Sequence, residues 1–305
     1  MIEQLKLLPN SSFASSDRLE PIVTLFALPK SFADNHTALI QRNAITSWTQ
    51  LGTSVRVILL GDEPGIEEIA AEFGLIHIAD LKRNKFGTPL LSDAFARVNS
   101  LSVGQLIAYV NSDIILVSDF LSALSSLLET KMEKFLVIGR RIDTDIESLI
   151  DFSSSDWSST LVDFAKATGT QAAVVCKDYF VFPQGQFTSI PEFCVGRGNW
   201  DNWMVASTRK SAVPIVDATD VITAIHQNHG YNHVKGGRSA AYVTGVEARE
   251  NLRLAGGRNL VAGCSADFRF EAARDDPKLI PVKSMAFWRD LPKFLSLVKR
   301  LLLER

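Results

Sequence analysis

The chain has 305 residues, of which 46% are hydrophobic and 22% charged, so it can bury a sizeable core. A formal net charge of −2 excludes the strongly basic composition that is typical of general nucleic-acid-binding proteins. We expect no transmembrane helix, because no run of about 18 apolar residues occurs. Three cysteines without CxxC spacing are typical of reduced thiols and favour a cytoplasmic location.

Short apolar runs alternate with segments of helical spacing over the first 110 residues. The runs at 22–28, 55–60, 75–78 and 106–110 predict strands, and the segments at 36–51, 64–73 and 89–98 predict helices. This alternation predicts an α/β fold, with a mostly parallel sheet covered by helices on both faces. Ligands bind such sheets at the carboxyl ends of the strands, so we expect the site in the loops 29–35, 61–65, 81–88 and 111–113.

The rest of the chain is less regular. We predict helices at 118–131, 156–168 and 201–210, and strands at 135–139, 179–182 and 221–225. Residues 236–283 are rich in Gly and Arg and have no clear periodicity. We therefore divide the chain into a polar, Ser-rich leader (1–20), an α/β domain (21–235) and a C-terminal extension (236–305).

The strongest local signal is Asn111-Ser112-Asp113, which ends the apolar run 106–110. A carboxylate at the end of a buried strand costs free energy unless it is paired or binds a cation. Asp113 therefore suits a divalent ion that bridges the protein to substrate phosphates, and the amide of Asn111 could hydrogen-bond a ribose hydroxyl. A simple Asx turn between two strands explains the tripeptide equally well.

A second signal is a histidine cluster, because three of the five histidines lie within eight residues of one another. His226 directly follows the predicted strand 221–225, and His229 and His233 come next. Neutral imidazole is a good ligand for Mn²⁺-like ions, so His226 is our first choice of metal ligand and His229 the reserve. The alternative is a polar loop with surface histidines.

A third signal is an irregular, aromatic-rich segment that begins with Gly196 and Gly198 and contains Trp200, Asp201 and Trp203. Aromatic faces commonly pack on sugar rings, and a carboxylate beside apolar rings has a raised pKa that suits a general base. The alternative is that Asp201 caps a helix and both tryptophans lie in the core.

Four further residues are weaker candidates. Asp62 follows the second predicted strand and could hold a nucleotide base or simply make a turn. Lys85 and Arg141 are natural phosphate partners, and Asp178 immediately precedes a predicted strand. Charged residues of this kind more often lie on an ordinary surface.

Taken together, these residues resemble the glycosyltransferases of the GT-A fold, which carry a short Asp-x-Asp motif at the end of a central strand. Asn111-Ser112-Asp113 looks like that motif with Asn in its first position, and Asp113 keeps the metal ligand. His226 and Lys235 match the order in which several members supply a histidine ligand and then a lysine near the phosphates. Asp201 resembles the base of inverting members. The resemblance covers about residues 22–235.

The resemblance implies an inverting glycosyltransferase that uses Mn²⁺ or Mg²⁺ and transfers a sugar from a nucleotide-sugar donor, such as a UDP-sugar, to a glycan or glycolipid hydroxyl. It implies donor contacts from Asn111, Ser112, Asp62, Lys85 and Lys235, and further substrate contacts from Arg141, Asp178, Trp200 and Trp203. A sugar-1-phosphate nucleotidyltransferase is disfavoured, because loop 29–35 has no glycine. A non-catalytic protein that binds sugar nucleotides or glycans remains an alternative.

Residues 287–305 predict an amphipathic helix, because their apolar residues recur on one helical face. From position 289 onward this segment has five basic and two acidic residues. Such a helix can lie on an anionic membrane surface, or it can pack on its own domain or on the second subunit of a homodimer. We therefore hypothesise a cytoplasmic protein with weak peripheral attachment to the inner face of the membrane.

Overall fold

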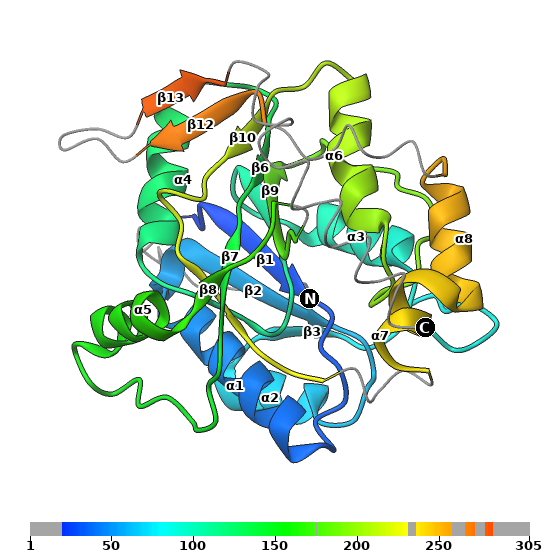
Figure 1. The fold of residues 1–305 in the computed structure, drawn as a ribbon, viewed down its shortest axis with the longest axis horizontal. Coiled ribbons are helices and arrows are strands. Elements are labelled where there is room, and N and C mark those ends of the chain that lie inside the picture. The colour runs from blue at the N-terminus through cyan, green and yellow to red at the C-terminus, as the bar shows by residue number, and fades with distance from the viewer. Residues whose placement is uncertain (1–19, 175, 231–235, 258–265, 272–277, 283–305) are drawn as a thin grey trace, which may run out of the picture.

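The computed structural model describes residues 20–174, 176–230, 236–257, 266–271 and 278–282. Its centre is a nine-stranded sheet with helices on both faces (Figure 1). In spatial order the strands are β13 (Lys278–Pro281), β12 (Phe268–Glu271), β10 (Ile215–Asp217), β6 (Leu136–Ile138), β9 (Tyr179–Pro183), β4 (Leu106–Val110), β1 (Val23–Ala27), β2 (Val55–Leu60) and β3 (Ile76–Ile78). Only β9 and β13 run antiparallel to their neighbours, so the predicted α/β fold with a mostly parallel sheet is confirmed.

A second, four-stranded sheet lies beside the first. Its order is β5 (Ile114–Leu116), β11 (Ala224–Gln227), β7 (Arg141–Thr144) and β8 (Thr170–Gln171). The helices are α1 (Asn35–Thr49), α2 (Ile66–Phe73), α3 (Leu91–Leu101), α4 (Asp119–Glu129), α5 (Trp157–Thr168), α6 (Trp200–Lys210), α7 (Gly237–Ser239) and α8 (Val246–Leu254), with a short 3-10 turn at Gly52–Ser54 and a π-helical segment at Ala240–Thr244. No helix within the described residues is long and apolar enough to cross a membrane.

Side chains that alternate along the strands fill two core layers, one on each face of the sheet. On one face, Val23 and Leu25 of β1 belong to the cluster that includes Trp48 of α1 and Phe120 of α4. On the other face, Phe26 meets Phe95 of α3 edge to face, with ring centroids 5.1 Å apart. Burial on both faces explains why these strands are continuous apolar runs in the sequence.

The predicted strand 221–225 is wrong in position. β11 begins at Ala224 and continues through His226 to Gln227, both of them buried. Gln227 is tolerated here because both ends of its amide have partners: the nitrogen donates to the carbonyl of Ile40 at 2.7 Å, and the oxygen accepts from Asn43 at 3.0 Å. His226 therefore lies within a strand rather than after one.

The short strands were the least predictable, and six of them (β5, β7, β8, β10, β12 and β13) were not predicted. They are two to four residues long, which is too short for a clear alternation. β12 pairs with β10, so part of the predicted C-terminal extension belongs to the central sheet. The domain division at residue 235 stays a prediction. The predicted helix 287–305 and residues 1–19 of the predicted leader lie outside the described residues.

Candidate metal centre and active-site cleft

A cleft of about 330 Å³ opens at the carboxyl ends of the parallel strands. All four loops in which the site was expected contribute to its wall. The charged and hydrogen-bonding side chains that line it include Lys30, Glu63, Arg83, Thr88, Tyr109, Asn111, Ser112, Asp113, Arg141, Asp178, Arg197, His226, His229 and Tyr242. Oxygen ligands, imidazoles and cations thus share one cavity.

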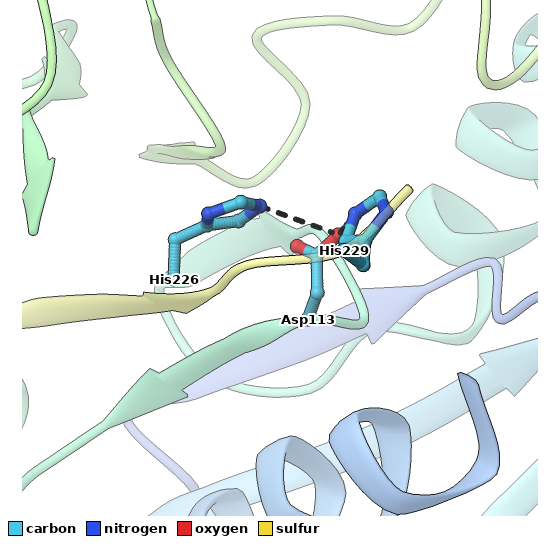
Figure 2. A group of neighbouring side chains, drawn as sticks. All are labelled: Asp113, His226 and His229. Carbon is cyan, nitrogen blue, oxygen red and sulfur yellow. Dashed lines mark hydrogen bonds and ion pairs between the residues drawn. The ribbon is translucent and has the colours of Figure 1, made fainter. Parts of the chain in front are cut away.

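Asp113, His226 and His229 point toward one another in this cleft (Figure 2). Asp113 lies in the turn between β4 and β5, and the antiparallel pairing of β5 with β11 places His226 beside it. The Nε2 atom of His229 lies 2.9 Å from Asp113 Oδ2, and that of His226 lies 3.9 Å from the same oxygen. One potential ligand atom from each of the three residues lies within 4.8 Å of the others.

This donor set fits a divalent ion. Asp113 Oδ1 is buried and has no hydrogen-bond partner among the described residues, which is costly for a charged oxygen that binds nothing. One carboxylate and two imidazoles suit a first-row ion such as Mn²⁺, with positions left for other ligands. Burial would raise the pKa of Asp113, but the hydrogen bond from His229 and the charges of His226 and Lys30 outweigh it and hold that pKa well below its usual range.

Asp143 of β7 lies beside His226, at the ring nitrogen that does not face Asp113. His226 pairs with Asp143 across the β11–β7 ladder, and its Nδ1 atom lies 2.9 Å from Asp143 Oδ1, at ion-pair distance but outside hydrogen-bond alignment. A carboxylate behind a ligand histidine is a common arrangement in metal sites, because it fixes the ring and raises its basicity. Asp143 was not predicted, since the sequence did not reveal β7.

Arg141 is placed where the sequence analysis expected a substrate-binding residue, but it is already engaged. Its Nε donates to Asp143 Oδ1 at 2.7 Å, and its Nη1 forms an ion pair with Asp178. Burial would lower the pKa of Arg141, but these two carboxylates outweigh it and raise that pKa. A ligand phosphate would have to share the guanidinium with them.

Asn111 is also engaged inside the protein. Its Nδ2 donates to Asp178 Oδ1 at 2.7 Å, and its Oδ1 accepts from the hydroxyl of Tyr109 at 2.9 Å. The predicted contact with a ribose hydroxyl therefore has to compete with these bonds, and it stays a prediction. The hydroxyl of Ser112 is buried and, within the described part of the chain, has no partner.

Lys30 is a cation that the sequence analysis missed. It follows β1, lines the cleft and is electrostatically coupled to Asp113. Burial lowers the pKa of Lys30, and the charge of Asp113 partly opposes this shift. The only sequence signal was its position in loop 29–35, directly after the first strand.

Two of the weaker candidates do not line the cleft. Asp62 is exposed and forms an ion pair with Arg83, which also binds Glu63 at 2.9 Å. Lys85 is exposed at the loop tip, with its Nζ 5.2 Å from the ring centroid of Phe86. Lys235 lies outside the described residues. Donor contacts from these three residues stay predictions.

Both tryptophans of the Gly196–Trp203 segment pack against other aromatic rings. Trp200 is buried against Tyr109, at a ring-centroid distance of 4.8 Å, and Trp203 meets Phe193 at 5.4 Å. Neither side chain lines the cleft, because the first turn of α6 directs both toward the core. This placement favours the packing alternative, and a contact of either ring with a sugar stays a prediction.

Asp201 lies in the first turn of α6, one residue beyond the start of the helix. Burial raises the pKa of Asp201, while the nearby charge of Lys177 opposes the shift. Its Oδ1 is buried and has no partner in the described ranges. Asp201 does not itself line the cleft, although it is coupled to Tyr109 and Asp178, which do.

No protein-family model matches the sequence, and no curated protein matches it. Among solved structures, the chain is similar to glucosyl-3-phosphoglycerate synthase from Mycobacterium tuberculosis in complex with Mn²⁺, UDP and phosphoglyceric acid. The identity is 14%, the TM-score is 0.45, and the match covers 86% of this chain and 88% of that one.

The chain is also similar to residues 1–349 of S. aureus TarS in complex with UDP-GlcNAc, at 10% identity and a TM-score of 0.43, over 80% of this chain and 67% of that one. Against the same TarS fragment without ligand, the match covers 42% of this chain and 38% of that one, at a TM-score of 0.32. Likeness at this level does not establish an activity for this chain, which has to be inferred from its own site.

Proposed function

We propose that this chain is a metal-dependent glycosyltransferase that moves a sugar from a nucleoside-diphosphate donor to a hydroxyl acceptor. The observation that carries the proposal is the Asp113–His226–His229 cluster, which lies in a cleft at the carboxyl ends of the parallel strands.

The donor would bind with its diphosphate between the cluster and Lys30. Asp113, His226 and His229 would hold Mn²⁺ or Mg²⁺, which would supply positive charge to the leaving diphosphate when bound. Lys30 adds a cation on the β1 side of the cleft. A UDP-sugar is the donor that the sequence resemblance favours.

Asp201 is the base that we propose for the acceptor hydroxyl, and direct displacement with inversion is the corresponding mechanism. Burial raises its pKa toward the range in which a carboxylate accepts a proton effectively. Because Asp201 lies next to the cleft rather than in its wall, acceptor binding has to open a path to its carboxylate. The acceptor class, a glycan or glycolipid, and attachment through residues 287–305 stay hypotheses.

The decisive experiment is a donor panel. The full chain is mixed with UDP-sugars and a sugar acceptor, with Mn²⁺ or with EDTA, and released UDP is measured. Release that depends on Mn²⁺ and on acceptor would support a glycosyltransferase, whereas tight UDP-sugar binding without release would indicate a binding protein. A nucleotidyltransferase would instead make the nucleotide sugar from a nucleoside triphosphate and a sugar 1-phosphate.

A further inference from the structure

Asn111 and Asp178 form a cross-strand pair at the wall of the cleft. β4 and β9 are antiparallel with Val110 opposite Tyr179, and the next backbone bond runs from Asn111 N–H to the carbonyl of Asp178 at 2.8 Å. The side chains meet as well, since Asn111 Nδ2 donates to Asp178 Oδ1 at 2.7 Å. The first residue of the Asn111–Asp113 turn is therefore tied to β9 through both its backbone and its side chain.

The partners of Asn111 explain why an amide stands at this position. Its Oδ1 accepts from the Tyr109 hydroxyl, while its Nδ2 donates to Asp178. A carboxylate at position 111 would have no donor to offer Asp178, and two like charges would face each other at hydrogen-bond distance. Arg141 forms an ion pair with the second oxygen of Asp178, so the Asp178 side chain cannot rotate away from Asn111 without breaking that ion pair.

We propose that Asp178 and Asn111 act as one acid–amide pair that positions Asp113 for metal binding, with the acidic member of the pair supplied from β9. This inference rests on the proposed function, because the metal is that of the proposed reaction. The turn is closed by Ile114 N–H donating to the carbonyl of Asn111 at 3.1 Å, so a rotation at Asn111 would carry Asp113 with it. Asp178 is thus a positioning residue, buried to 7% exposure.

If the two side chains act as a pair, exchanging them between positions 111 and 178 should preserve their hydrogen bonds. N111D alone places two carboxylates together, and D178N alone removes the charge that holds Arg141. In the double variant N111D/D178N, the new amide at position 178 donates to the new carboxylate at position 111 and accepts from Arg141. The Tyr109 hydroxyl can still donate to position 111, so every hydrogen bond of the network is restored.

The test is a four-protein cycle on the full chain, in which Mn²⁺ affinity is measured by electron paramagnetic resonance in the presence of UDP. Each single variant should bind Mn²⁺ about 10–100-fold more weakly, which is the usual effect of losing a group that orients a metal ligand. The double variant should recover most of this loss. Single variants with unchanged Mn²⁺ affinity, or a double variant no better than the weaker single, would overturn the inference.

Thermal unfolding of the same four proteins without metal separates this inference from the proposed function. Coupling between positions 111 and 178 in the metal-free chain is expected if the pair exists, because neighbours in one hydrogen-bond network are non-additive. A wild-type chain that binds no Mn²⁺ would refute the proposed function and the positioning role together. If the wild type binds Mn²⁺ but the effects of the two substitutions on unfolding are simply additive, the pair would be refuted and the proposed function would not.

Discussion

Replacing Asp113 with Asn changes the charge of the candidate metal centre while keeping its volume. The carboxylate is 2.9 Å from His229 and is coupled to His226 and Lys30, so the variant leaves these three groups without their shared counter-charge. Losing an outer-shell partner usually costs 10–100-fold in metal affinity. Because Asp113 is a proposed ligand itself, we expect a loss of at least about 100-fold, or about 2.7 kcal/mol.

The same variant should reverse its effect when metal is absent. Without a cation, the Asp113 carboxylate repels a diphosphate, so Asp113→Asn should bind UDP more tightly than wild type in EDTA and more weakly in Mn²⁺. Isothermal titration calorimetry under both conditions measures this crossover. Asp119→Asn is the matched control, because Asp119 is a partly buried carboxylate at the start of α4 that accepts from Thr223 N–H outside the cleft.

A stability measurement completes this test. The folded state lowers the pKa of Asp113, so its ionised form contributes stability that is present above the usual carboxyl pKa and is lost as the pH falls through the lowered value. Asp113→Asn should therefore be less stable at neutral pH but still folded. Unchanged Mn²⁺-dependent UDP affinity in a folded variant would show that Asp113 is not a metal ligand.

Two further predictions concern the neighbours of Asp113. His226→Ala and His229→Ala should each weaken Mn²⁺ binding, and a structure with metal and UDP in which neither imidazole reaches coordinating distance (about 2.0–2.1 Å) would contradict both assignments. Lys30→Met should weaken UDP binding both with and without metal, by about 10–100-fold for a lost charge-assisted contact. Lys85→Met is its control, since Lys85 is exposed and does not line the cleft; equal losses in both variants would mean that the charge acts only at long range.

The part of the fold that the sequence predicted is the part built from long, doubly buried strands. β1, β2 and β4 are mostly apolar because both faces of the sheet are covered over most of their length, and this pattern needs no knowledge of distant contacts. The second sheet could not be predicted in the same way. β7 contains Arg141 and Asp143, which are acceptable in a strand because each finds a polar partner from another segment, Asp178 for Arg141 and His226 for Asp143.

The same reasoning separates what could and could not be predicted about the candidate site. Asp113 and the histidines were predicted from short local signals, and the pairing of β5 with β11 then brings them together. Asp143 had no local signal, and Lys30 had only its position after the first strand, because the roles of both residues depend on which strands become neighbours. Trp200 had a local signal that fits two environments, since an aromatic residue beside a carboxylate looks the same in a core as in a sugar site, and the structure places it in the core.

Asp201→Asn is the substitution for which activity and stability should change in opposite directions. Turnover should fall by about 10²–10⁴-fold if Asp201 is the base, while UDP binding should be kept. Burial raises the folded-state pKa of Asp201, so its stabilising contribution is complete below the unfolded pKa and is lost as the pH rises through the raised value. The amide of Asn does not ionise and therefore avoids that loss, so the Asp201→Asn variant should be at least as stable as wild type at neutral pH.

The activity of the wild type should show the same ionisation. The acidic limb of its pH–activity profile should lie at a higher pH than an ordinary carboxyl would give, because the base has to be deprotonated before it can accept a proton. Asp119→Asn again supplies the comparison: burial also raises the pKa of Asp119, and the amide oxygen of the variant can still accept from Thr223 N–H, so this variant should keep both its stability and its turnover. The anomer of the product, read by NMR, should be opposite to that of the donor. Full turnover in Asp201→Asn, or retention of configuration, would show that Asp201 is not the base of the reaction.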